Sequence, residues 1–584
     1  MDRRTIGAIL LMMAIAVAPA IFLKKPPPRS SGPATSQSRA ADSLARLPAG
    51  DSLGTRPATP AGRTDSAART GTDSTSVPGP GLAGISTPNT VRVTSPLYTY
   101  GVSTRGARLI QATLPRYRSM APTDQGRTAQ ILPDDSRLLG LTLVVGQDTV
   151  RLDDWTFTAS AESLAVTKPT PLHLRSTRDG IDVDLTYTFR PDDYRIDVSG
   201  RATGVGPNGG LLVIGLGPTI SNTEADSTEN HRALALVTKH DDTERLDFGG
   251  LKPGEPKTVS GPLEWAAVKS KYFVTGVLAY DSTGGIISGV RAAAEPATGK
   301  HSTRADIRLS LPLPPSGNFS YTVYAGPMEY DRLSRLGHGF NDVNPYGWPG
   351  FRTVIRPLAA GVRWLLVWMH EHQHLANGLV LIFFGVLVRL LLWPLNQKAM
   401  RANMQLQSVQ PLMKEIQEKH KNDPQKVQQE MFKLYKEHGV NPLGGCWPML
   451  LPMPVLFALF FVFQNTIELR GASFLWLPDL SRPDPLYIIP VLMGLSMFGL
   501  SKVGQMGMEP NPQMKMMLYV MPAMMTFLFL NFASGLNLYY AVSNIASIPQ
   551  QWLLARERQK RTARTIVEVK TRTQDSPRRA KRKA

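Results

Sequence analysis

The stretch LVLIFFGVLVRLLLW, residues 379–393, is apolar throughout except for Arg389. Residues 375–393 together have the length of a membrane-spanning helix, in which a lone guanidinium costs about 2.5–3.5 kcal/mol on insertion scales. Charged side chains kept inside a span usually face a helix bundle or a water-filled cavity. Lys398 and Arg401 follow closely, so snorkelling of Arg389 to the cytoplasmic interface is the simpler alternative. Arg389 therefore marks either a hydrophilic cavity or the edge of the membrane.

A second apolar segment, residues 535–554, carries its polar residues at helical spacing. They recur every three or four positions, which places them on one face of a helix. This polar stripe consists of Asn537, Tyr540, Asn544, Ser547 and Gln551. A polar face inside a bilayer must meet water, another polar group or a passing chain. Hydrogen bonding between helices is the simpler use of such a face. Together with the arginine in the other span, the stripe favours a shared hydrophilic cavity.

The overall composition does not reveal these segments, because the low hydropathy of the N-terminal half offsets the high hydropathy of the C-terminal region. The mean hydropathy over 584 residues is −0.13. Cys446 is the single cysteine, which excludes an internal disulfide. The length leaves room for several domains.

The N-terminal region divides into an apolar run and a polar linker. Arg3 and Arg4 precede an apolar run at residues 6–23, and a retained transmembrane anchor over residues 1–23 is predicted. A cleaved signal peptide is the alternative, although the only cleavage-like sequence, at residues 18–20, is weak. Residues 24–90 are rich in Pro, Ser and Thr and poor in aromatic residues, which predicts a disordered linker.

Residues 91–340 show short runs of alternating apolar and polar residues, separated by Gly, Pro, Asn and Asp. The clearest run, IDVDLTYTF at residues 181–189, is apolar on one face only. Similar runs lie at 107–114, 138–145, 194–198, 211–216, 272–278, 306–311 and 319–324. This pattern predicts a large antiparallel β-sandwich. Its histidines lack the spacing of metal ligands, so a structural role is the expected one.

The remaining chain is predicted to be helical. Residues 341–374 include an amphipathic segment with three arginines and two tryptophans, which is typical of a helix lying in the membrane interface. Residues 375–555 contain five apolar spans, at 375–393, 446–464, 486–500, 515–531 and 535–554. Between the first two, a polar helical hairpin is predicted at 396–440, with Asp423 and Pro424 as the N-cap and first residue of its second helix.

Charge predicts the orientation of the spans. The hairpin carries eight Lys and Arg residues between Lys398 and Lys436, and the tail at residues 556–584 carries twelve against three acidic residues. Basic segments beside spans remain in the cytoplasm. With the N-terminal anchor we therefore expect six spans, with both termini in the cytoplasm and the β-domain on the opposite side of the membrane.

Several motifs in a fixed order make this chain similar to one family. They are VRLLLWPL at residues 388–395, NPLGGCWP at 441–448, PMP at 452–454, ELR at 468–470 and SGLNLYYAVSN at 534–544. Weaker similarity lies in TRGA at 104–107 and KYF at 271–273. With these motifs the chain resembles the YidC family of membrane-protein insertases, in the form that carries a large periplasmic domain. The resemblance covers most of the chain except the linker and the tail.

The resemblance implies a multi-pass insertase of the bacterial inner membrane, with its β-domain in the periplasm, that works without nucleotide, metal or other cofactor and is not an enzyme. It implies a five-span core with a groove open to the cytoplasm and to lipid, in which Arg389 and the polar stripe attract the client's polar segment. The client's apolar segment would then slide along the second and fourth core spans. The residues expected on this slide are Met449, Met453, Leu456, Met517, Met521 and Met524. Methionine suits contact with many different sequences, although ordinary core filling is the simpler use of it.

The expected partners are nascent membrane proteins, Sec translocon components, the ribosome through the basic tail, and anionic lipids, with no role for DNA. Gly385 and Leu456 stand where related sequences carry other residues.

A transporter that binds an anionic solute at Arg389 is the alternative function, but such folds usually contain internal repeats, and none is evident here. A third hypothesis is that the β-domain binds or modifies carbohydrate. A sugar-modifying site would need an acid/base pair of carboxylates in a cleft, and the sequence does not display such a pair.

Overall fold

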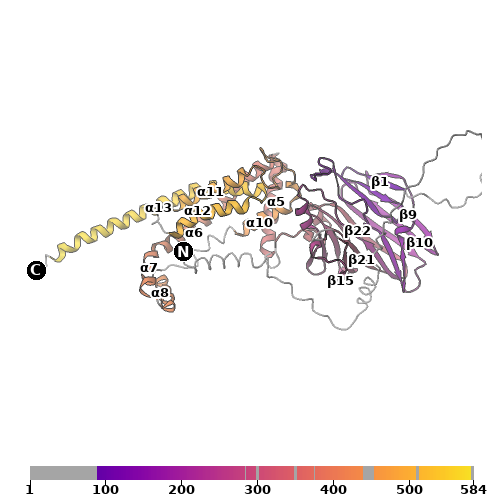
Figure 1. The fold of residues 1–584 in the computed structure, drawn as a ribbon, viewed down its shortest axis with the longest axis horizontal. Coiled ribbons are helices and arrows are strands. Elements are labelled where there is room, and N and C mark those ends of the chain that lie inside the picture. The colour runs from indigo at the N-terminus through magenta and orange to yellow at the C-terminus, as the bar shows by residue number, and fades with distance from the viewer. Residues whose placement is uncertain are drawn as a thin grey trace, which may run out of the picture.

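The computed structural model describes residues 89–282, 284–296, 302–347, 352–373, 375–421, 423–438, 453–507 and 512–580. A β-domain occupies one end of the molecule, and the helices extend from it toward the C-terminus (Figure 1). The predicted anchor at residues 1–23 and nearly all of the predicted linker lie outside the described residues.

The β-domain contains three larger sheets in its described part. The first has the order β4-β3-β2-β1-β8, formed by β1 (Thr90–Thr94), β2 (Thr99–Ser103), β3 (Leu109–Arg118), β4 (Thr128–Gln130) and β8 (Ser163–Ala165). The second has the order β14-β13-β16-β17-β22-β11-β10-β9-β7, formed by β14 (Thr243–Asp247), β13 (Ala235–Lys239), β16 (Trp265–Lys269), β17 (Phe273–Leu278), β22 (Asn318–Pro327), β11 (Arg195–Thr203), β10 (Ile181–Phe189), β9 (Thr170–Arg178) and β7 (Thr158–Ala159).

The third sheet has the order β15-β20-β21-β12-β5-β6, formed by β15 (Lys257–Leu263), β20 (Ile287–Ala294), β21 (Ala305–Leu313), β12 (Gly210–Gly215), β5 (Leu141–Val145) and β6 (Asp148–Arg151). A small hairpin of β18 (Tyr280–Asp281) and β19 (Gly284–Gly285) lies apart from these sheets. Short helices α3 (Ser227–Ala233), η1 (Leu152–Asp154) and η2 (Phe248–Gly250) connect strands. The faces of the sheets enclose one large apolar core.

Each run predicted as a strand is a strand in the structure. In β10, side chains alternate between buried and more exposed positions along Ile181–Phe189, as a one-sided apolar pattern requires. The sheets are antiparallel with one exception: β1 pairs with β8 in parallel. That pair joins strands about seventy residues apart in sequence, so the local alternation pattern carried no information about its direction.

The segment that leaves the β-domain is held by polar contacts. It contains α4 (Tyr330–Arg335), η3 (Phe340–Val343) and α5 (Arg352–Gln373). Lys269 in β16 is buried and donates from Nζ to Oδ1 of Asn344, 2.7 Å away. Burial lowers the pKa of Lys269 to about 7. This contact ties the chain after η3 back to the central strands of the nine-stranded sheet.

Helix α5 is the predicted interfacial helix, and two of its arginines pair with acidic residues of the preceding segment. Arg356 lies 3.1 Å from Asp342, measured from Nη1 to Oδ2. Arg363 is buried and lies 2.6 Å from Asp331, measured from Nη2 to Oδ1. Its guanidinium also lies over the ring of Tyr330. The two tryptophans of α5 are exposed. The arginines of this amphipathic helix therefore serve as contacts to the β-domain end of the molecule.

The helical region consists of α6 (Asn377–Ser408), α7 (Gln410–Lys419), α8 (Pro424–Glu437), α10 (Met453–Asn465), η5 (Ile467–Leu469), α11 (Ile488–Gly504), α12 (Pro512–Phe529) and α13 (Ser534–Ala580). Helix α13 packs against α6 and α11, α12 against α11, and α10 against α5 (Figure 1). Each predicted span coincides with one of these helices, although residues 446–452 of the second lie outside the described ones. Of the described helices, only α6 is both long and apolar enough to cross a bilayer, at Asn377–Pro394.

A helical hairpin of α7 and α8 lies within the predicted range 396–440, but its first helix begins only at Gln410, because the residues up to Ser408 continue α6. Asp423 caps α8, since its Oδ1 accepts from the backbone N–H of Lys426 at 3.1 Å, and Pro424 is the first helical residue. Val409 and Leu434 are buried between the two helices. The hairpin lies at the end of the helices opposite to the β-domain (Figure 1).

A structured loop precedes α11 at the end nearer the β-domain. Asp484 is fully buried and accepts three hydrogen bonds there. Its Oδ1 accepts from the backbone N–H of Leu486 at 2.9 Å and from Nε1 of Trp476 at 3.2 Å. Its Oδ2 accepts from the backbone N–H of Ile489 at 2.8 Å, in the first turn of α11. One carboxylate therefore fixes the loop and the start of the helix together.

Candidate functional site

Arg389 lies in α6 and its side chain is half-buried. Nε of Arg389 donates to Oγ of Ser543 in α13, 3.2 Å away. Among the described residues, no carboxylate oxygen lies within 4.0 Å of this guanidinium. The charge is thus held by a hydroxyl group between two apolar helices and is not neutralised by a described acidic residue.

The polar stripe lies on α13 as predicted, but its members have different surroundings. Asn537 is fully buried, and its Nδ2 donates to the backbone carbonyl of Phe529 at 3.0 Å. Its Oδ1 is buried without a hydrogen-bond partner among the described residues. The hydroxyl of Tyr540 is also buried without one, and its ring packs edge-on against Phe529. This end of the stripe, nearer the β-domain, is closed by α12.

The other end of the stripe faces α11. Nδ2 of Asn544 donates to Oγ of Ser496 at 3.2 Å. Ser547 donates to the backbone carbonyl of Ser543 in its own helix, at 2.6 Å. Gln551 is half-buried beside Gly504 at the end of α11. Asn537 and Asn544 therefore join helices, which is the simpler of the two uses that the sequence allowed for the stripe.

The described hydrogen-bond partner of Arg389 is not a member of the stripe, and the residues that join α13 to α6 here were missed from the sequence. Ser543 is its partner, and Gln550 donates from Nε2 to the backbone carbonyl of Trp393 in α6 at 2.9 Å. Ser543 is three residues after Tyr540 and four before Ser547, so helical spacing already placed it at the edge of the stripe. Extending the stripe to that edge would have identified both contacts with α6.

A glycine allows α6 and α13 to lie close together at this level. A Cβ on Gly385 would lie 3.2 Å from Cγ1 of Val542. Small residues permit such close helix contact within membranes. Gly385 therefore lies one turn from Arg389 at a tight helix crossing.

The residues predicted for the apolar slide lie on α10 and α12 where the structure describes them. Met449 and the side chain of Met453 are outside the described part of the chain. Leu456 in α10 is half-buried. In α12, Met517 and Met524 are exposed and Met521 is half-buried. They share α12 with other exposed apolar side chains, namely Tyr519, Val520, Phe527 and Leu528. The slide remains a prediction for both helices.

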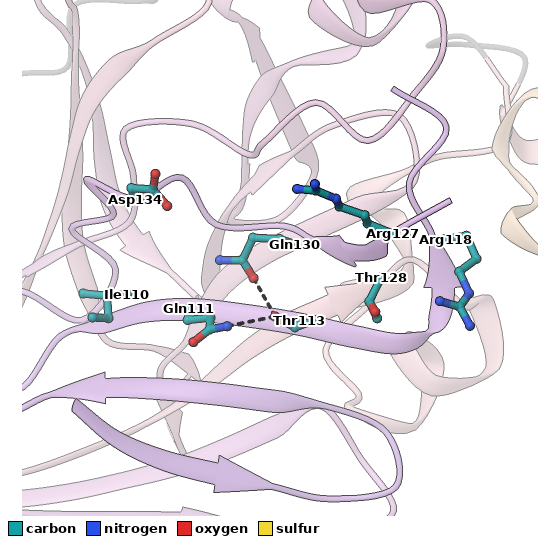
Figure 2. Close-up of a pocket in the computed structure, with 8 residues that line it drawn as sticks. All are labelled: Ile110, Gln111, Thr113, Arg118, Arg127, Thr128, Gln130 and Asp134. Atoms are coloured by element: carbon teal, nitrogen blue, oxygen red, sulfur yellow. Dashed lines mark hydrogen bonds between the residues drawn. The ribbon is translucent and has the colours of Figure 1, made fainter. Parts of the chain in front are cut away.

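The β-domain has an open polar pocket of about 720 Å³ beside β3 and β4 (Figure 2). Its lining includes Gln111, Thr113 and Gln130, whose side chains hydrogen-bond to one another. Asp134 is the one carboxylate in the lining, and a sugar-cleaving site requires two. The pocket therefore gives no support to a carbohydrate-active β-domain. Within the described residues, no group of three or more His, Cys, Asp or Glu residues could hold a metal ion.

Comparison with known proteins agrees with a periplasmic β-domain joined to a membrane-embedded helical region. Residues 368–562 match the family described as 60Kd inner membrane protein, and residues 90–360 match the YidC periplasmic domain. The membrane protein insertase YidC of Chlorobaculum tepidum is 31% identical over 501 residues, covering 80% of this chain and 82% of that protein. The YidC of Nitratidesulfovibrio vulgaris is 32% identical over 492 residues, covering 81% and 88%.

A solved structure of an active YidC insertase aligns over 80% of this chain, with 16% identity and a TM-score of 0.33. The domain matches and the extent of the sequence identity decide the assignment. This chain belongs to the YidC family of membrane protein insertases.

Proposed function

We propose that this protein inserts newly synthesised membrane proteins into the bacterial inner membrane through a hydrophilic groove that contains Arg389. The observation that supports the groove best is the surroundings of that arginine. Its guanidinium lies half-buried between apolar helices with Ser543 as its described partner. A charge without a neutralising partner attracts an acidic or polar segment of a client.

The polar residues of α13 would lower the cost of moving that segment. A polar group that leaves water without a partner loses several kcal/mol in an apolar medium, of order 2–7 kcal/mol for an amide or hydroxyl. Asn537 and Tyr540 both have a buried polar atom without a described partner. These atoms offer hydrogen bonds to a chain that reaches the inner end of the groove. The hydrogen bonds of Asn537 and Asn544 to other helices hold the same face in place.

The apolar slide would carry the hydrophobic segment of the client into lipid. The exposed methionines of α12 lie on a helix whose outward side chains are otherwise large and apolar. Methionine is flexible and polarisable, so it adapts to clients with different sequences. We place the slide on α10 and α12, with Leu456, Met517, Met521 and Met524 as its described members and Met449 and Met453 as the others.

We further propose six spans, with the N-terminal anchor and the five core segments crossing the membrane. The basic hairpin and the β-domain lie at opposite ends of the helices, which supports placing them on opposite sides of the bilayer (Figure 1). The positive charge of the hairpin and of the tail assigns that end to the cytoplasm. Helix α5 would lie in the periplasmic interface, with its exposed tryptophans toward the headgroups.

The proposed activity is tested by the purified protein in lipid vesicles without other proteins. A small client with an acidic translocated segment should become protected from external protease in these vesicles. Protein-free vesicles should protect less of it. Equal protection in both kinds of vesicle would contradict insertion by this chain alone, and would leave cooperation with the Sec translocon as the remaining proposal.

Single cysteines test whether the polar stripe lines a wet groove. With Cys446 replaced, cysteines at Ser547 and Gln551 should react with a water-soluble maleimide added on the cytoplasmic side, and reactivity should fall toward Asn537. Ile545 is a matched control, because it is 49% exposed on another face of α13 and would contact lipid. Equal rates at Ser547, Gln551 and Ile545 would mean that the stripe serves only to join helices.

The basic tail is proposed to bind the ribosome. Arg558, the third residue of this tail, donates from Nη1 to the backbone carbonyl of Gly504 at 2.9 Å, which holds the start of the tail at the end of α11. Removal of residues 559–584 retains that contact and deletes most of the positive charge. We expect the truncated protein to co-sediment less with empty ribosomes in detergent, because phosphate contacts are lost. Unchanged co-sedimentation would assign the tail to anionic lipid or to topology.

A further inference from the structure

The short turn between α10 and α11 joins the two halves of the molecule. It comprises η5 and the next residue, Arg470. Ile467 is buried in the apolar core of the β-domain, whereas Leu469 is buried in that of the helices. The two charged residues of the same turn, Glu468 and Arg470, pair with different partners on either side of Leu469. This turn therefore contacts both the β-domain and the helical region.

Arg470 reaches the β-domain with every nitrogen of its guanidinium. Nε donates to both carboxylate oxygens of Glu224, at 2.9 and 3.1 Å. Nη1 donates to the backbone carbonyl of Arg118 and Nη2 to that of Thr223, each at 2.9 Å. The side chains of Arg470 and Glu224 are 3% and 9% exposed. The guanidinium also lies 5.5 Å from the ring centre of Phe273.

The arrangement of hydrogen-bond acceptors around residue 470 is specific to arginine. A planar guanidinium presents five N–H donors in fixed directions, whereas an ammonium is a compact point charge on a flexible stem. The partners of Arg470 are one carboxylate and two carbonyls from two separate segments of the β-domain. A lysine at this position would retain attraction to Glu224 but could not satisfy all of these acceptors at once.

The second charged residue of the turn extends the connection to α5. Glu468 lies 3.5 Å from Arg363, measured from Oε1 to Nη1. Arg363 in turn pairs with Asp331 in α4. The β-domain, the turn and α5 are thus linked through Glu468 and Arg470, which lie two positions apart in one short segment.

We propose that Arg470 is a positioning residue that holds the β-domain in one orientation on the helical region. Removing it leaves the buried carboxylate of Glu224 with a hydrogen bond from Oγ1 of Thr223 but without its charged partner, which is strongly unfavourable. The two domains then separate or rotate, because exposure to water is the available way to solvate that carboxylate. This inference concerns the docking of the domains and does not depend on the insertase function.

The test measures the distance between two spin labels in the full-length protein with Cys446 replaced. One label is attached at Lys257, an exposed residue of β15, and the other at Leu486, which is 60% exposed before α11. We expect one narrow distance distribution in the otherwise unchanged protein. Arg470→Gln and Arg470→Lys should both lose it and give a broad distribution.

Two further variants make the result decisive. Arg482→Gln removes an exposed arginine from the neighbouring loop and should leave the distribution narrow. Glu224→Ala removes the partner from within the β-domain, without altering the turn, and should broaden the distribution as Arg470→Gln does. A narrow distribution in Arg470→Gln or in Glu224→Ala would overturn the proposal. Rescue by Arg470→Lys would show that charge attraction alone docks the domain, which would also overturn it.

Discussion

Arg389→Ala is expected to reduce the insertion of clients with an acidic translocated segment by roughly tenfold or more. Opposite charges about 4 Å apart interact by about 4 kcal/mol at an effective dielectric constant of 20. Loss of about 1.4 kcal/mol of that attraction in the rate-limiting step already slows insertion tenfold. The measurement is the initial rate at which such a client becomes protease-protected in vesicles containing the variant.

Two comparisons show whether charge is the cause. Arg389→Lys should retain most of the rate, because Ser543 and an acidic client need a positive charge more than a guanidinium. A client whose translocated segment is uncharged and whose span is strongly hydrophobic should be affected much less by Arg389→Ala. If wild type and Arg389→Ala insert the acidic client at the same rate, the proposed role of Arg389 is wrong.

Asp484→Ala is expected to destabilise the loop before α11 and the helix that follows it. The variant loses the carboxylate that accepts from two backbone N–H groups and from Trp476. Hydrogen bonds to a charged group contribute about 1.5–3 kcal/mol each, and the buried backbone N–H of Ile489 is left without this acceptor. We expect a loss of several kcal/mol, measured as the fall in the denaturant midpoint of the purified protein in detergent.

Asp484→Asn distinguishes the hydrogen bonds from the side-chain volume. Asparagine retains one oxygen acceptor but turns an N–H₂ group toward the backbone N–H groups, so an intermediate loss is expected. Asp242→Ala removes an exposed carboxylate from the β-domain and should change stability by less than about 0.5 kcal/mol. Equal midpoints for Asp484→Ala and wild type would mean that the buried contacts contribute nothing.

The β-domain was predictable from sequence because its strands alternate locally. Residues 181–189 have the same limits in the pattern and in β10, and period-two burial follows directly from the pleat. Sheet order was not predictable, since it depends on contacts between distant segments. The parallel pairing of β1 with β8 is an example.

The candidate site was predictable in part for a similar physical reason. Helical spacing identifies which residues of α13 share a face, but not which neighbouring helix each of them meets. Asn544 faces Ser496 in α11, whereas Ser543, the next residue toward the N-terminus, faces Arg389 in α6. The sequence also gave no sign that Arg470 and Glu224, 246 positions apart, form a buried pair.

Helix α13 continues without interruption from Ser534 to Ala580, well past the apolar segment (Figure 1). At 1.5 Å per residue, the 26 positions from Leu554 to Ala580 extend about 40 Å beyond the end of that segment. A tilt imposed at the distal end of this continuous helix would be transmitted along it to the turn that carries Ser543 and Asn544. A partner bound to the basic end of α13 would therefore exert force on the same helix whose Ser543 accepts a hydrogen bond from Arg389.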